Sequence, residues 1–128
     1  MAEFDYTVET GKSVDEATAA VEAQTKEHGF SVLHVHDVYA TLTGKGFPCE
    51  PLKIVEVCNA KYASQVLAAD VRIALMLPCP ISVYAKDGRT YISALRPSVM
   101  VDFYPEADIR EVAEAVEEAV VAIVDGAR

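Results

Sequence analysis

The chain has 128 residues, of which 52% are hydrophobic and 24% are charged, and this composition is typical of one soluble globular domain with its own hydrophobic core. The formal net charge of -9 argues against nucleic acid and anionic membranes as partners, because an acidic surface repels phosphate groups. No apolar stretch reaches the roughly 18 residues that span a membrane, and the acidic start Met1–Asp5 differs from a basic signal peptide. We therefore expect a single cytoplasmic domain over residues 1–128.

The N-terminal third carries two strand patterns and one helix pattern. Apolar and polar residues alternate over residues 4–9, which predicts a half-buried strand. Ser13 and Glu16 form a capping box, so a helix is expected to start directly after Ser13 and to end at Gly29. Residues 30–38 are rich in β-branched side chains and predict a second strand.

The middle of the chain combines an irregular segment with three regular ones. Residues 39–51 contain several glycines and prolines, which indicates a long loop with at most one helical turn. Residues 52–57 predict a strand, and Asn59 is a good N-cap for a helix over residues 60–69. The apolar run over residues 73–77 is interpreted as a further strand.

A hairpin follows this run. Two alternating segments, residues 81–86 and 89–95, are joined by Asp87 and Gly88, which is the strongest short-range hairpin signal. The next apolar segment, residues 99–103, has a pattern that leaves its type open.

The last element and the order of all elements indicate the fold class. Residues 109–124 carry apolar side chains at three- and four-residue spacing, which predicts a helix with Gly126 at its end. The whole order favours an α+β two-layer sandwich, with a mainly antiparallel sheet and helices packed on one face. The other face of the sheet is only partly polar, and a second copy of the chain is the simplest cover for it. We therefore expect a homodimer.

Three cysteines, Cys49, Cys58 and Cys79, form no C-x-x-C pair and are expected to be reduced. Cys58 and Cys79 each follow the predicted end of a strand, so neighbouring strands would place both thiols at one edge of the sheet. Cys58 also precedes the helix capped by Asn59, whose N-terminus favours a thiolate and lowers the pKa of Cys58. Prolines on both sides of Cys79 hold it rigidly. The alternative interpretation is that both cysteines are small buried hydrophobic residues.

His34 and His36 are the other candidate ligands, because they lie two residues apart on one face of a strand. Together with Cys58 and Cys79 they suit a soft metal such as copper(I) or zinc. No zinc-motif spacing is present, and the alternative is a half-buried histidine pair bonded to the backbone or to Asp37. The absence of P-loop, G-x-G-x-x-G, G-x-S-x-G and H-E-x-x-H motifs excludes the easily recognised enzyme classes.

Several short stretches occur together along the chain, namely Gly29-Phe30, His34–Asp37, Glu56–Asn59, Leu77–Cys79, Val83-Tyr84 and Ser93–Pro97. Together they resemble the DUF302 family, small bacterial and archaeal proteins of unknown function. The resemblance implies a compact α+β fold with an antiparallel sheet, commonly a dimer, without an established activity. It also implies that the family's cysteines correspond to Cys58 and Cys79, whereas Cys49 has no counterpart. The chain departs from the family at Ala60, where proline is frequent, and at Pro80, where arginine or a polar residue often follows the second cysteine.

Three functions are compatible with these residues. The leading hypothesis is a homodimer, without demonstrable enzymatic activity, that binds a small ligand or a soft metal at Cys58, Asn59 and Cys79, with copper, zinc or haem as candidate cofactors. The first alternative is a thiol redox protein in which Cys58 is the nucleophile and Cys79 resolves it as a disulfide. The second alternative is a structural dimerisation scaffold whose thiols belong to the core.

Overall fold

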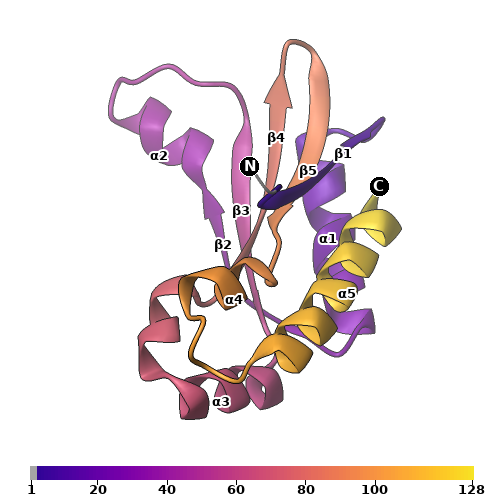
Figure 1. Cartoon of the computed structure of the whole chain (residues 1–128). Helices are drawn as coiled ribbons and strands as arrows, with labels where there is room; N and C mark the ends of the chain where they lie inside the picture. Colours follow the sequence, from indigo (N-terminus) through magenta and orange to yellow (C-terminus); the bar gives the residue numbers. More distant parts are fainter. Residues whose placement is uncertain (1–2) are drawn as a thin grey trace.

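A five-stranded antiparallel sheet forms the centre of the computed structural model, which describes residues 3–128 (Figure 1). The strand order is β1-β5-β4-β3-β2. The strands are β1 (Asp5–Thr10), β2 (Ser31–Asp37), β3 (Leu52–Cys58), β4 (Cys79–Lys86) and β5 (Arg89–Leu95). The helices are α1 (Val14–Glu27), α2 (Val38–Gly44), α3 (Ala60–Ala69), the 3-10 helix η1 (Val71–Met76), α4 (Val99–Phe103) and α5 (Arg110–Ala127). The predicted α+β class with an antiparallel sheet is confirmed.

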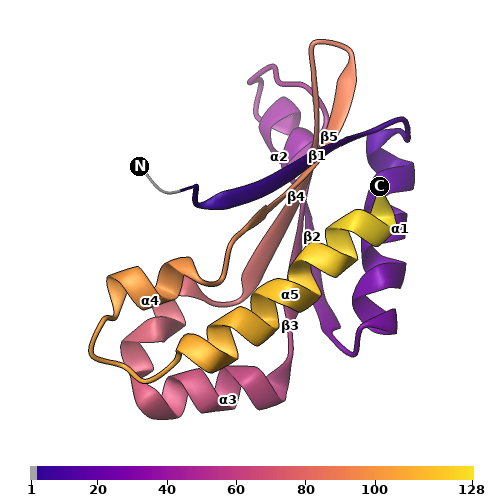
Figure 2. The same cartoon turned by 45° about the vertical axis from the view of Figure 1, so that its right-hand side comes forward.

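Two helices cover one face of the sheet. α1 contacts β2, β3 and β4, whereas α5 contacts β5 and β1, and the two helices pack against each other (Figure 2). The main hydrophobic core lies between these layers, where Val55, Ile81 and Ile92 are fully buried. Because alternate residues of a strand share one face, the period-two pattern of each strand directs these side chains towards the helices.

A second hydrophobic cluster lies beyond one end of the sheet, among α3, η1, α4 and the start of α5 (Figure 2). Its buried members are Val66, Ile73, Met100, Ile109 and Ala113. The start of α4 is fixed to α5 because the Ser98 hydroxyl donates a hydrogen bond of 2.5 Å to the carboxylate of Glu117. The two clusters meet at the end of the sheet where β3 ends and β4 begins.

Local signals predict several element ends correctly. Ser13 Oγ accepts a hydrogen bond from the N–H of Glu16, and the Glu16 carboxylate accepts one from the N–H of Ser13. This reciprocal pair is the predicted capping box at the start of α1. Asp87 and Gly88 have φ angles of 52° and 80°, as a tight two-residue hairpin turn requires at both positions.

Two predictions for the middle of the chain are wrong. The first six residues of the predicted loop, 39–44, belong to α2, because the Asp37 carboxylate accepts a hydrogen bond from an N–H of its first turn. The run over residues 73–77, predicted as a strand, lies largely in η1, where Asp70 caps the helix and Ile73 is fully buried. A short apolar run fits a buried helical turn as well as a buried strand, so its composition does not separate the two.

The C-terminal segments complete the comparison. Residues 99–103, whose type the pattern left open, form α4. Gly126 does not end α5 but lies inside it, and the side chain of Gln24 occupies the space where a Cβ at this position would lie. Within residues 3–128, no helix is long and apolar enough to cross a membrane.

Candidate functional site

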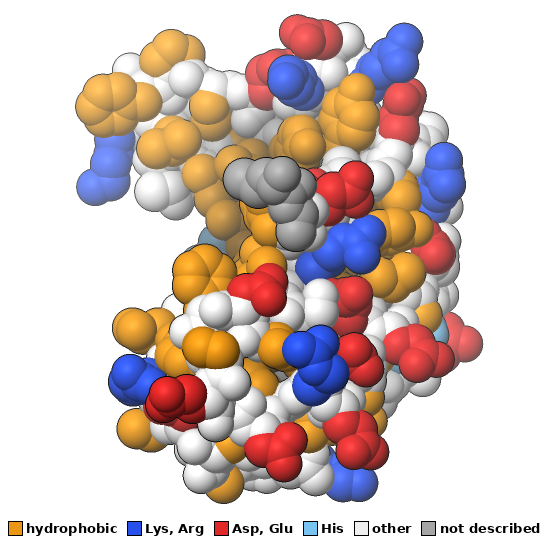
Figure 3. Space-filling model, in the orientation of Figure 1, with side chains coloured by type: hydrophobic (Ala, Val, Ile, Leu, Met, Phe, Trp, Pro, Cys, Tyr) orange, Lys and Arg blue, Asp and Glu red, His pale blue; other side chains and the backbone are white. Residues whose placement is uncertain are grey.

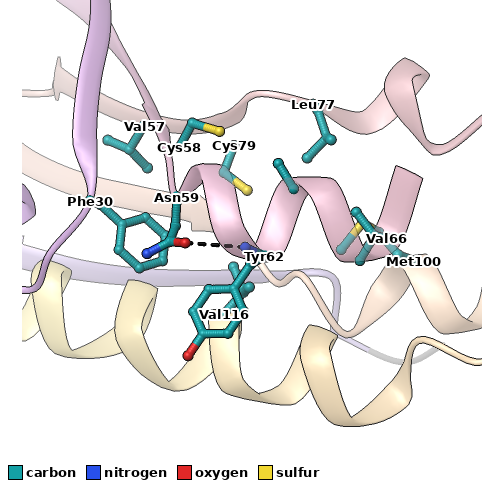
Figure 4. A pocket seen from close by; sticks show the side chains of 11 residues that line it. Phe30, Val57, Cys58, Asn59, Tyr62, Val66, Leu77, Cys79, Met100 and Val116 are labelled. Atoms are coloured by element: carbon teal, nitrogen blue, oxygen red, sulfur yellow. Dashed lines mark hydrogen bonds between the residues drawn. The ribbon is translucent and has the colours of Figure 1, made fainter. Parts of the chain in front are cut away.

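Cys58 and Cys79 lie next to each other at one end of the sheet. Cys58 is the last residue of β3, and Cys79 is the first residue of β4. These strands are antiparallel neighbours in which Val57 pairs with Cys79, so the residue after Val57 lies beside Cys79 (Figure 4). Cys79 was expected to follow a strand over residues 73–77, and it begins β4 instead. Antiparallel pairing nevertheless brings the two residues together, and both of their thiols are free.

Both cysteines line a narrow apolar pocket. Its lining residues are Phe30, Val57, Cys58, Asn59, Tyr62, Ala63, Val66, Leu77, Cys79, Met100 and Val116 (Figure 4). The pocket contains about 330 Å³ of empty space including its open mouth, and its inner part has room for about one water molecule. Phe30 and Val116 belong to the main core, whereas Val66 and Met100 belong to the second cluster. The pocket is therefore a gap at the junction of the two clusters.

Asn59 holds the wall of this pocket in place. Its Oδ1 accepts a hydrogen bond of 3.1 Å from the N–H of Tyr62, which is the predicted N-cap of α3. Its Nδ2 donates a hydrogen bond of 3.3 Å to the carbonyl of Gly29 and so ties α3 to the turn before β2. Both ends of the amide are thus bonded to the backbone, and Asn59 fixes the place where Cys58 leaves β3.

Burial keeps both thiols protonated near neutral pH. It raises the pKa of Cys79 to about 11, with a smaller contribution from the neighbouring Cys58. It also raises the pKa of Cys58 above its ordinary value. The prediction that the N-terminus of α3 lowers the pKa of Cys58 is wrong, because the loss of hydration on burial raises this pKa. Neither thiol is a ready nucleophile in this state.

His34 and His36 lie on the face of the sheet that α1 and α5 leave uncovered. They alternate along β2 with Val35, which pairs with the fully buried Val55 of the helix-covered face. Their rings contact each other edge-to-face with centroids 4.4 Å apart. His36 Nε2 lies 3.3 Å from the carboxylate of Glu56. The acidic partner of His36 is therefore Glu56 and not Asp37, which the sequence suggested.

The predicted ligand set of His34, His36, Cys58 and Cys79 is not assembled within the chain. Cys79 shares the helix-covered face with Ile81, two residues later in β4, whereas the histidines point to the other side of the sheet. Among residues 3–128, no three His, Cys, Asp or Glu side chains come close enough together to hold a metal ion. Any metal bound in the pocket therefore depends on the two cysteines and not on the histidines.

Met100 is a pocket residue that the sequence analysis missed. It is buried in the second cluster and reaches the pocket from α4. No local signal identifies it, because its place in the pocket wall arises only from the packing of α4 against α5. Cys49, in contrast, is half-buried in the loop after α2 and is not part of the pocket lining.

Nearly the whole chain matches one protein family. Residues 6–127 match the family described as domain of unknown function DUF302. The chain belongs to the DUF302 family. A crystal structure of an uncharacterized conserved DUF302 protein from Bacillus stearothermophilus is 32% identical to it and has a TM-score of 0.93, over 99% of this chain and 100% of that chain. A comparison with curated proteins gave no match.

Ala60 and Pro80, the two positions at which the sequence was expected to depart from the family, leave the cysteines in place. Ala60 takes the first position of α3, and the helix forms there because Asn59 supplies the cap. Pro80 is the second residue of β4 and pairs with Glu56 across the sheet. Cys58 and Cys79 therefore keep their positions at the ends of adjacent strands.

Proposed function

We propose that this DUF302 domain binds a soft metal ion, of which Cu(I) fits best, between the thiols of Cys58 and Cys79. The observation that carries the proposal is that two free thiols line one apolar pocket. Sulfur donors select soft ions such as Cu(I) over harder ones. Zinc is less well suited, because structural zinc sites use four protein ligands and the part of the chain that the structure describes brings no three such residues together.

The dimensions of the pocket favour an ion over a larger ligand. Its inner part has room for about one water molecule, which is comparable to the volume of a metal ion. A haem group does not fit into this space unless the two hydrophobic clusters separate. The polar side chain of Asn59 is already bonded to Tyr62 and Gly29, so the thiols are the groups that an occupant would contact.

Proton release is part of the proposed binding step. Both thiols must lose their protons when the metal binds, because a thiolate is the ligand form. The pKa of Cys79 is about 11 and that of Cys58 is raised, so only an ion with a strong affinity for sulfur displaces these protons near neutral pH. One Cu(I) ion with two thiolates carries a single net negative charge, which costs less in apolar surroundings than two unpaired thiolates.

The same protonation states give less support to the thiol redox alternative. A redox-active cysteine requires a substantial thiolate fraction at working pH. Burial instead raises the pKa of both Cys58 and Cys79, which lowers the fraction of thiolate at neutral pH.

The two reduced thiols are consistent with a reducing compartment, and we propose a cytoplasmic location on this basis.

Competition of the reduced protein with the chromophoric chelator bicinchoninate for Cu(I) tests the proposed function. We expect the wild type, Cys49→Ser and His34→Ala to withdraw Cu(I) from the chelator equally, since Cys49 and His34 do not line the pocket. Cys58→Ser and Cys79→Ser should each lose this ability while circular dichroism shows that they remain folded. Equal Cu(I) uptake by folded Cys58→Ser and wild type would reject the thiol site.

We also propose that the chain forms a homodimer through the uncovered face of the sheet and the adjoining α2 segment. Stacked Tyr84 and Tyr91 lie on this face, with ring centroids 5.5 Å apart. Tyr39 in α2 and Phe47 after it are 42% and 62% exposed. Figure 3 shows hydrophobic side chains gathered over α2 and its loop, beside a hollow in the surface. A second copy would bury this apolar surface in a closed two-fold contact.

The mass of the protein in solution tests the homodimer. Sedimentation velocity should give twice the chain mass of 13.9 kDa for the wild type. Phe47→Lys should shift the equilibrium towards the single chain, because it places a charge in the proposed interface. Glu114→Lys, on the exposed side of α5, should not. A wild type that sediments as a single chain at all concentrations would exclude this assembly.

A further inference from the structure

Two histidine rings are in contact on the uncovered face of the sheet. His34 and His36 are both on the edge strand β2, and their ring centroids are 4.4 Å apart at an interplanar angle of 67°. Both residues are exposed, and 45% of the His36 side chain is open to solvent. Neither residue lines the thiol pocket. An ion in solution can therefore reach both rings without entering the core.

The separation of the two rings matches that of two imidazoles bound to one metal ion. An imidazole nitrogen binds a transition metal at about 2.0 to 2.1 Å, which places the ring centroid about 3.2 Å from the ion. At the right angle of square-planar or octahedral coordination two such centroids are about 4.5 Å apart, whereas a tetrahedral angle requires about 5.2 Å. The distance of 4.4 Å between His34 and His36 agrees with the right angle. This geometry favours Ni²⁺ or Cu²⁺ over tetrahedral Zn²⁺.

We propose that His34 and His36 together chelate a divalent transition-metal ion with right-angle coordination, such as Ni²⁺, and that water fills its remaining positions. This site is separate from the thiol pocket. It takes a harder ion than Cu(I), because imidazole is a harder donor than thiolate. It uses two residues of one chain and requires no residue of a second copy.

Glu56 orients one of the two ligands before the ion arrives. Its carboxylate lies 3.3 Å from His36 Nε2, and Glu56 also pairs with His34 across strands β2 and β3. A histidine that binds a metal usually donates its other ring N–H to a carboxylate or carbonyl, which fixes the tautomer. Donation of the Nε2 proton to Glu56 leaves Nδ1 of His36 for the metal. Glu56 is thus a positioning residue, in keeping with the finding that residues 3–128 assemble no three-residue ligand group.

A purely structural histidine pair makes a different prediction. Aromatic rings often pack edge to face without any ligand, and in that case Ni²⁺ has no preference among the three histidines of the chain. The third, His28, is an internal control. It is exposed at the C-cap of α1, where its Nδ1 lies 2.9 Å from the carbonyl oxygen of Gln24. If the pair is a chelate, Ni²⁺ binds His34 and His36 before it binds His28.

NMR of the histidine ring protons during titration of the reduced protein with Ni²⁺ tests the proposal, because the paramagnetic ion broadens the signals of rings close to it. We expect the signals of His34 and His36 to disappear at a lower Ni²⁺ concentration than those of His28. His34→Gln and His36→Gln should each lower the Ni²⁺ affinity at least about 10-fold, since one imidazole cannot chelate, and Glu56→Gln should lower it about 10-fold. Glu56→Gln should have no further effect when combined with His36→Gln, because its role is to orient His36.

Two variants control for the other proposed sites. Cys58→Ser removes a pocket thiol and Phe47→Lys favours the single chain, and both should bind Ni²⁺ as the wild type does. Loss of Ni²⁺ binding in Cys58→Ser would overturn the proposal, because a thiol would then be a ligand. Loss in Phe47→Lys would overturn the claim that one chain holds the ion.

Equal broadening of all three histidine signals would overturn the chelate, as would an unchanged Ni²⁺ affinity in folded His34→Gln. These outcomes leave the Cu(I) site of Cys58 and Cys79 untouched, because competition with bicinchoninate measures that site separately. Failure of the thiols to bind Cu(I) would likewise leave the histidine site standing.

Discussion

Removal of the Cys79 thiol should change how the stability of the protein depends on pH. Burial raises the pKa of Cys79 from about 9 to about 11 in the folded chain, whereas the unfolded chain exposes this thiol to water. At about 1.4 kcal/mol per pKa unit, a shift of this size corresponds to about 2 to 3 kcal/mol. The fold accommodates the protonated thiol, so this contribution is fully present below pH 9 and is lost as the pH rises to about 11.

Urea denaturation of the reduced, metal-free protein at a series of alkaline pH values measures this effect. Tyrosines and lysines also titrate in this range, so the informative quantity is the difference between the wild type and Cys79→Ala. The wild type should lose about 2 to 3 kcal/mol more stability than Cys79→Ala over this range, whereas Cys49→Ala should follow the wild type. Parallel curves for wild type and Cys79→Ala would refute the claim that a buried, protonated thiol occupies the pocket.

Three further outcomes are expected. Asn59→Ala should lower the free energy of unfolding by about 1 kcal/mol through loss of the α3 cap, and Asn59→Asp should retain most of it, as chemical denaturation would show. Ile73→Ala should lower the free energy of unfolding by about 2 to 5 kcal/mol, because Ile73 is fully buried. Leu75→Ala should lower it by less than about 0.5 kcal/mol, because the Leu75 side chain is 86% exposed. Equal losses of stability in the two variants would contradict the placement of η1. Cu(I) affinity should rise about 100-fold per pH unit around neutral pH, because Cys58 and Cys79 each release a proton when the metal binds. Chelator competition at several pH values measures this slope, and an affinity that does not change with pH would contradict it.

The features predicted correctly from the sequence are those encoded over a few neighbouring residues. The capping box at Ser13 and the turn at Asp87 and Gly88 are local, and the structure contains both. η1 was missed because an apolar run does not distinguish a buried strand from a buried helical turn. Gly126 was interpreted as a helix end, but it lies where α5 passes close to Gln24, which depends on the packing of α1.

The candidate site likewise combines features that local sequence signals predict with features that depend on packing between distant segments. The proximity of Cys58 and Cys79 followed from strand ends, and adjacent antiparallel strands produced it although one of the predicted strands is absent. The raised pKa of Cys58 depends on burial among helices from distant parts of the chain, so the local argument from the α3 N-terminus predicted the wrong direction. Met100 enters the pocket only through the docking of α4, and no spacing in the sequence indicates it.

The central claim is that Cys58 and Cys79 together hold a soft metal ion. Anomalous diffraction at the copper edge from crystals of the reduced protein loaded with Cu(I) tests it most directly, because the peak locates the ion. We predict a peak between the two cysteine sulfur atoms. A peak beside His34 and His36, or no peak after exposure of the protein to excess Cu(I), would contradict the claim. The pocket would then be only a gap between two hydrophobic clusters.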